Sequence, residues 1–201
     1  MTERSQKPSG RWVLWAIAAI GGLPWLLAWY LVDHPGLIGQ SSHHGHLIQP
    51  LQAFNYEWFQ PAAHLASPPL AEIRGRWVII HFLPHDCDRA CRQLIADTYK
   101  LHLLLNKDMP RVRRLVVWSE QALPTEELRG FLAQDKGLYF AILSPAFLEK
   151  QEGEIAKTLL QNGGVVVMDP LGNWLMWYDL KFDPYGLYRD LKRLLNVSHI
   201  G

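Results

Sequence analysis

The feature that most constrains the fold is a strand-to-helix junction at residues 76–92, which carries both cysteines of the chain. Residues 77–82 form a short run of apolar and β-branched residues, which is typical of a buried strand and too short for a helix. After Cys87 the apolar residues recur with helical spacing. We therefore predict a strand over 77–82, a polar loop, and a helix over about 88–106 with Cys87 and Cys91 at its N-terminus.

The position of the two cysteines indicates reactive thiols. A helix N-terminus has unpaired N–H groups and a partial positive charge, which favour the thiolate that acts as nucleophile and metal ligand. Residues four apart on a helix share one face, with Cα atoms about 6 Å apart, within the disulfide range. Cys87 and Cys91 could thus form a reversible disulfide, bind one soft metal ion such as copper, or do both. The alternative is a structural bridge or two inert thiols, although so short a loop adds less stability than a long one.

Composition limits the class of protein. With 201 residues, of which 49% are hydrophobic, the chain has room for a membrane anchor and one domain with a real core. Its 20 basic and 19 acidic residues give a formal net charge of +1. This balance lacks the basic footprint of a nucleic-acid-binding protein, so we expect no nucleic-acid partner.

An uncharged run near the N-terminus predicts a membrane anchor. Residues 12–32 contain no charged side chain, and about 20 apolar residues are enough to cross a bilayer as a helix. Tryptophan and tyrosine stand near both ends of the run, where amphipathic rings favour the two membrane interfaces. A secretory signal peptide is the alternative, but its apolar region is usually shorter, and no small-x-small cleavage site follows this one.

The residues before the anchor predict its orientation. Residues 1–11 carry Arg4, Lys7 and Arg11 against Glu3, and such a basic tail usually stays in the cytoplasm. The rest of the chain would then lie across the membrane, which in a bacterium is the periplasm, an oxidising compartment that suits a cysteine pair. We expect a single-pass protein of the bacterial inner membrane, with the domain in the periplasm.

The expected domains are a cytoplasmic tail at 1–11, an anchor at 12–32, a juxtamembrane connector at 33–70 and a folded domain at 71–201. The connector is rich in proline and contains the histidine tract at 43–46. Clustered imidazoles could bind copper or nickel and pass the metal to a neighbouring site. The alternative is a solvated loop that happens to carry histidines.

The remainder of the domain alternates between strand and helix patterns. We expect strands at 111–118 and 138–143, helices at 125–134 and from 144 to about 162, a hairpin at 165–178 and an amphipathic helix at 184–195. Alternation of this kind predicts an α/β fold with a mainly parallel sheet, covered by helices on both faces, to which the hairpin adds an antiparallel edge.

Three of these features together resemble the thioredoxin superfamily: a cysteine pair after the first strand, an Asp-Pro-x-Gly hairpin at 169–172 and a closing amphipathic helix. Within it, the Cys87-x-x-x-Cys91 spacing, the single anchor and the strand at 77–82 look most like the Sco family of membrane-anchored copper proteins. Residues 42–50 also resemble the segment after the anchor in small single-span proteobacterial proteins that accompany haem-copper oxidase assembly genes.

The resemblance implies a thioredoxin-like fold and a role in assembling the copper site of cytochrome c oxidase. Cys87 and Cys91 would be the catalytic residues of thiol-disulfide exchange, or two of the ligands of a transferred Cu(I) ion. The partners would be the inner membrane and an oxidase subunit or another oxidase assembly factor.

Two departures from the family pattern are visible in the sequence. Sco proteins use a histidine as third copper ligand about where Gln161 or Asn162 stands here, and no histidine occurs between His102 and His199. His85, two residues before Cys87, is our candidate for the third ligand. His81, inside a strand, is expected to be a core or sheet-face residue, and His102 is expected to lie on the surface of the helix.

Thioredoxin-like oxidoreductases usually have two residues between the cysteines, and a proline where Gly163-Gly164 stands here. These departures keep two further hypotheses open. One is a scaffold or binding module with a structural disulfide, docking on an oxidase subunit or an assembly factor. The other is a peroxiredoxin-like enzyme, in which peroxide would oxidise the sulfur of a single cysteine.

Overall fold

The computed structural model describes residues 10–34, 43–62, 65–84, 87–119, 124–150, 154–198 and 200–201. It divides into two compact units, Met1–Ser42 and His43–Gly201. The first unit contains helix α1 (Gly10–Asp33), and residues 11–33 of this helix are long and apolar enough to cross a membrane. A helix therefore covers the whole uncharged run at 12–32.

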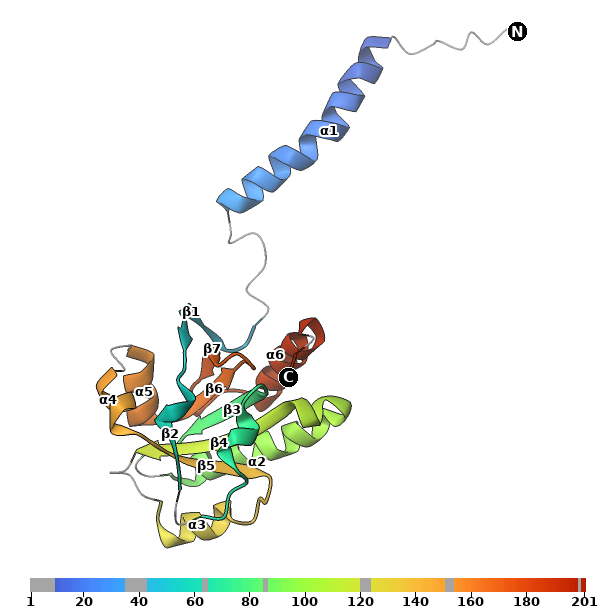
Figure 1. Ribbon diagram of the computed structural model, residues 1–201. Coiled ribbons are helices and arrows are strands. Elements are labelled where there is room, and N and C mark those ends of the chain that lie inside the picture. The colour runs from blue at the N-terminus through green and yellow to red at the C-terminus, as the bar shows by residue number, and fades with distance from the viewer. Residues whose placement is uncertain are drawn as a thin grey trace. The chain divides into compact units, whose positions relative to one another are not determined.

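The second unit is built on a seven-stranded sheet in the order β1-β7-β6-β3-β4-β5-β2 (Figure 1). The strands are β1 (His46–Ala53), β2 (Phe59–Pro61), β3 (Trp77–Phe82), β4 (Val112–Ser119), β5 (Leu138–Leu143), β6 (Gly164–Met168) and β7 (Asn173–Tyr178). The three strands β3, β4 and β5 are parallel, and every other neighbouring pair is antiparallel.

The sheet is mixed, where the sequence pattern predicted a mainly parallel one. The antiparallel hairpin of β6 and β7 lies inside the sheet, because β1 pairs with β7 and forms the edge. The opposite edge is β2, which pairs antiparallel with β5. Both edge strands come from the stretch at 33–70 that was expected to be a connector, and its prolines hid their strand character.

Helices cover both faces of the sheet. The α-helices of this unit are α2 (Arg89–Leu104), α3 (Glu126–Leu132), α4 (Pro145–Lys150), α5 (Glu154–Asn162) and α6 (Pro184–Val197). The 3₁₀ helices are η2 (Tyr56–Trp58), η3 (Leu70–Ile73) and η4 (Asn106–Arg111). Cores shared with the sheet place α2, α3 and α6 on one face and α4 and α5 on the other. The single helix expected from 144 to 162 is thus two helices, with residues 151–153 outside the described part of the chain.

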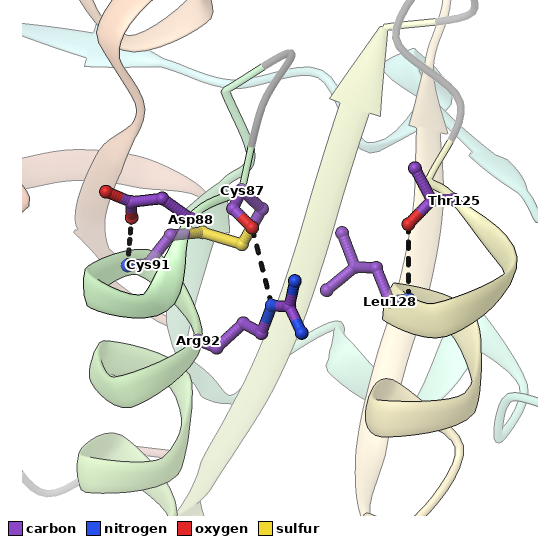
Figure 2. Close-up of a disulfide and its surroundings, with 6 residues drawn as sticks. All are labelled: Cys87, Asp88, Cys91, Arg92, Thr125 and Leu128. Carbon is purple, nitrogen blue, oxygen red and sulfur yellow. Dashed lines mark hydrogen bonds between the residues drawn. A yellow bond between two sulfur atoms is a disulfide. The ribbon is translucent and has the colours of Figure 1, made fainter.

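The parallel centre of the sheet positions the cysteine pair. All six residues of β3 are buried, which explains why five of them are apolar, and the sixth, His81, is also buried. Because β3 and β4 are parallel neighbours, their carboxyl ends lie at the same edge of the sheet. One end leads towards Cys87 and α2, and the other towards α3, so the starts of these two helices lie close together (Figure 2).

Candidate functional site

Cys87 and Cys91 form a disulfide at the N-terminus of α2, with their Cα atoms 5.3 Å apart (Figure 2). Cys91 lies in the first turn of the helix and Cys87 two residues before its first residue. The pairing confirms the predicted proximity of the two cysteines, but Cys87 precedes the extended N-cap residue Asp88, so the two residues do not lie on one helix face as the spacing argument assumed. The structure therefore places the two predicted site cysteines together.

The two sulfur-bearing residues differ in accessibility. Cys91 is only 2% exposed and packs in the core between the sheet, α2 and α3, against residues such as Ile95 and Leu128. Cys87 is partly exposed and lies at the border of the same core. Of the two joined residues, Cys87 is therefore the one that is open to solvent, whereas Cys91 is shielded.

Asp88 caps the helix that carries the disulfide. Its backbone is extended, and its carboxylate accepts a hydrogen bond of 2.9 Å from the backbone N–H of Cys91. This is the usual N-cap arrangement, and it satisfies a donor that the helix leaves unpaired. It also places a negative charge beside the cysteines and occupies an N–H group that could otherwise stabilise a thiolate.

Arg92 joins the cysteines to α3. Its Nε donates a hydrogen bond of 3.5 Å to the carbonyl of Cys87, and its Nη1 lies 2.5 Å from Oε1 of Glu127. Figure 2 shows the Arg92 side chain directed towards the Cys87 backbone. Sequence reasoning noted the charge of Arg92 but not this contact, because Glu127 reaches it only through the alignment of β3 with β4.

The candidate third metal ligand, His85, lies outside the described residues. Two other histidines are engaged in the fold, and of these His81 is a core residue, as expected. His81 is buried and donates through Nε2 to Thr98 Oγ1, 3.1 Å away, because the Thr98 hydroxyl itself donates to the carbonyl of Ile95. Burial and the neighbouring cation Arg114 lower the pKa of His81 to about 3, so its ring is neutral at physiological pH.

His102 was expected on the helix surface, but it is partly buried, and its Nε2 donates to the carbonyls of Met109 and Val112. Gln161 and Asn162, where a Sco protein would have its histidine, are exposed at the end of α5. Within the part of the chain that the structure describes, no group of three His, Cys, Asp or Glu side chains is arranged to hold a metal ion.

Gly163 stands at the position where thioredoxin-like oxidoreductases usually have a proline. A Cβ at this position would lie 2.8 Å from Cδ of Pro84, and φ is +76°, so glycine is required on both counts. Pro84 comes just before the loop that leads to Cys87, and Phe82 pairs with Gly164 at the start of β6. The glycine pair thus brings β6 tightly against the chain that enters the cysteine loop.

The histidine tract of the expected connector is packed on the folded domain. The buried carboxylate of Asp190 on α6 accepts hydrogen bonds from the backbone N–H groups of His44 and Gly45 and from the Tyr178 hydroxyl. It also pairs with Nδ1 of His44 at 3.2 Å, while the His46 ring stacks on Trp177. These contacts hold the tract in place, as opposed to leaving it a solvated loop.

Burial alone would raise the pKa of Asp190, but the hydrogen bonds from His44, Gly45 and Tyr178 hold it below its ordinary value. Burial, followed by the Asp190 charge, strongly raises the pKa of the Tyr178 hydroxyl. Asp190 is therefore ionised and Tyr178 neutral at physiological pH, in a cluster that sequence reasoning did not find.

Comparison with known proteins identifies the family. The model of a family described as "transmembrane-like, thioredoxin-like, C-terminal domain" matches residues 77–198, more than half of the chain. The chain belongs to this family. The matched range begins with β3, includes the cysteine pair and ends just after α6, so it covers the parallel strands, the hairpin and the closing helix of the thioredoxin-like domain.

Solved structures share this thioredoxin-like fold. Apo Sco1 from Thermus thermophilus matches with a TM-score of 0.54 and 16% identity, over 76% of this chain and 96% of Sco1. The thioredoxin domain of a thiol-disulfide oxidoreductase from Bacteroides vulgatus matches with a TM-score of 0.48 and 15% identity, over 69% and 92% of the two chains.

Copper-bound ScoI from Arabidopsis thaliana matches with a TM-score of 0.47 and 14% identity, over 64% of this chain and 88% of ScoI. No curated protein matches the chain. The Thermus thermophilus Sco1 match, together with the family model, confirms the predicted thioredoxin-like α/β fold.

Proposed function

We propose that this protein is a membrane-anchored assembly factor for cytochrome c oxidase that acts by thiol-disulfide exchange through Cys87 and Cys91. The observation that carries the proposal is the disulfide at the start of α2, which joins the partly exposed residue Cys87 to the buried residue Cys91. A thiolate of the partner attacks one sulfur and the other leaves, which requires an accessible sulfur and a nearby resolving one. Cys87 takes the first role and Cys91 the second.

The anchor and the compartment are part of the proposal. The apolar helix at 11–33 would hold the protein in the bacterial inner membrane, with the basic tail in the cytoplasm and the domain in the periplasm. Alkaline phosphatase, which is active only in the periplasm, tests this when it is fused after Gly201. Active fusions support the orientation, and inactive but stably expressed fusions would contradict it.

A second candidate function is the transfer of Cu(I) as cargo through the same cysteine pair. The donor set favours it, because two thiolates from Cys87 and Cys91 suit the soft Cu(I) ion. His85 remains our proposed third ligand. Copper competition with a chromophoric chelator tests this: about one Cu(I) per reduced chain, lost in the C87S/C91S variant, would support transfer, and binding independent of the cysteines would exclude it.

The oxidase role is tested in the native host. We expect the C87S/C91S variant to lose most oxidase activity while the protein still accumulates in the membrane. Oxidase activity equal to wild type would refute the proposal and favour a scaffold whose disulfide is structural.

Single variants then trap the partner. In C91S the Cys87 thiolate attacks a disulfide of the partner and releases one partner sulfur as a thiolate; because no resolving thiol follows, we expect the mixed disulfide to persist until reducing agent releases it. The matched C87S variant keeps only the buried Cys91 and should trap about tenfold less. Equal trapping by both variants would contradict the assigned roles.

A further inference from the structure

Arg92 holds a position between the reactive cysteines and a carboxylate on another helix. It follows Cys91 directly in α2, and its side chain is 34% exposed, whereas that of its partner Glu127 is 75% exposed. One end of its guanidinium group donates to the Cys87 carbonyl and the other pairs with Glu127. The same side chain therefore contacts the backbone of the accessible cysteine and an exposed anion.

The disulfide itself has no need of a cation, since it is neutral. Reduction changes this, because a thiolate is an anion that a nearby opposite charge stabilises. The helix N-terminus provides only part of that stabilisation here, since Asp88 already occupies the N–H of Cys91 and adds a negative charge. Arg92 is the cation that the structure brings into contact with Cys87.

We propose that Arg92 is a positioning residue that stabilises the Cys87 thiolate in the reduced protein. In the disulfide form its guanidinium group pairs with Glu127, and on reduction it turns to the Cys87 sulfur. This inference rests on the proposed thiol-exchange function and adds to it the residue that sets the redox balance. Glu127 then favours the disulfide form, because its ion pair with Arg92 holds the guanidinium group away from the Cys87 sulfur.

The redox step involves a dithiol as electron donor. The dithiol becomes a disulfide as it gives up two electrons and two protons, and the Cys87–Cys91 bond breaks. One proton goes to the Cys91 sulfur as a thiol and the other to solvent, which leaves the Cys87 sulfur as a thiolate beside Arg92. In the reverse direction the Cys87–Cys91 bond forms again, and the guanidinium returns to Glu127.

The test measures the reduced fraction of the full chain in detergent micelles, equilibrated with dithiothreitol redox buffers and read by mass after alkylation. We expect R92Q to lower the ratio of reduced to oxidised protein about tenfold at a given buffer, which corresponds to about 30 mV. R92K keeps the charge and should restore most of the ratio. E127Q releases Arg92 and should raise the ratio about threefold.

The matched control is R129Q, which removes the same charge and an ion pair with Glu126 on α3 but leaves the Cys87 contact intact. It should leave the ratio unchanged. A second readout is the pH at which Cys87 alkylation reaches half its maximal rate, which should rise in R92Q and fall in E127Q. Far-UV circular dichroism verifies that all four variants are folded.

An R92Q ratio equal to that of wild type, or E127Q shifting the ratio in the same direction as R92Q, would overturn the inference. The redox ratio needs no partner protein, so its outcome is separate from that of the oxidase assay. A shifted ratio with intact oxidase activity in C87S/C91S would retain Arg92 as the redox-setting residue and reject the oxidase role. An unshifted ratio in R92Q with lost oxidase activity in C87S/C91S would reject the role of Arg92 and retain the oxidase role.

Discussion

Two polar regions of the domain stand out, and they differ in what surrounds them. The cysteine end of α2 comprises Cys87, Asp88, Cys91 and Arg92, and the Asp190 cluster comprises His44, Gly45, Tyr178 and Asp190. In the sequence, the cysteine pair was the candidate reactive site, whereas the histidine tract was either a metal-binding segment or a solvated loop. In the structure the Asp190 carboxylate is buried and accepts from three different donor residues. At the cysteine end, Cys87 and Arg92 remain partly exposed.

The difference teaches that a chemically reactive side chain can serve as a reaction site only where it stays accessible to a partner molecule. The hydrogen bonds from His44 and Gly45 to Asp190 hold the histidine tract, and with it the start of the domain, against α6, and the bond from Tyr178 joins β7 to the same carboxylate. The cysteine end has fewer hydrogen bonds, and its two cysteines are joined by a disulfide, which a thiol can reduce. The following experiments test this contrast between a fastening cluster and a reactive end.

The largest effect is expected for D190A. This change leaves the Tyr178 hydroxyl and the N–H groups of His44 and Gly45 without their acceptor inside the protein, which should cost about 3 kcal/mol of unfolding free energy. Urea unfolding of the chain in detergent measures it. The control D179A removes an exposed carboxylate at the end of β7 and should cost less than about 1 kcal/mol. Equal losses in both variants would break the comparison.

Reduction of the disulfide should cost about 2 kcal/mol or less. The bond closes a loop of only a few residues, so it removes little entropy from the unfolded chain. Urea unfolding with and without reductant measures the loss, and reduced wild type should match C87S/C91S. A loss above about 4 kcal/mol would make the disulfide a structural staple and favour the scaffold hypothesis.

A pH series on D190N sharpens the role of the buried carboxylate. The folded-state pKa of Asp190 is below its ordinary value, so ionised Asp190 stabilises the fold above about pH 4, and this contribution disappears as the pH falls through the folded-state pKa. Asparagine does not titrate. We expect wild type to exceed D190N by about 1.5 kcal/mol at pH 7, with the difference shrinking below about pH 4. A constant difference down to pH 2 would contradict the prediction.

The smallest effect is expected for the cap of α2. D88A removes the acceptor for the Cys91 N–H and should cost about 1 kcal/mol in urea unfolding. D88S keeps a capping oxygen without the charge, so its stability should stay near wild type. Because D88S also removes a negative charge beside the cysteines, its reduced fraction in dithiothreitol buffer should rise. A fall in that fraction would contradict the electrostatic account of the cysteine end.

Local patterns were enough for much of the fold. The strand at 77–82, the strand at 138–143 and the closing helix agree closely with β3, β5 and α6. Each signal depends on neighbours within a few residues, through burial along a strand or apolar spacing on a helix. The cysteine pair was readable for the same reason, since a sequence separation of four residues keeps the two cysteines within reach of each other.

Other features depend on residues far apart in the chain. β1 pairs with β7 across more than a hundred residues, and its proline gave no strand signal. The mixed character of the sheet follows from these edge strands, which is why alternation of strands and helices predicted too much parallel pairing.

By itself, the sequence determined the apolar helix, the order of the central elements and the cysteine pair, because their signals are periodicity, length and spacing along the chain. Only the tertiary structure decided which sulfur is accessible, that Asp190 holds the histidine tract, and that Arg92 meets Glu127. Those outcomes depend on burial and on hydrogen bonds between elements, which come together only when the sheet has formed.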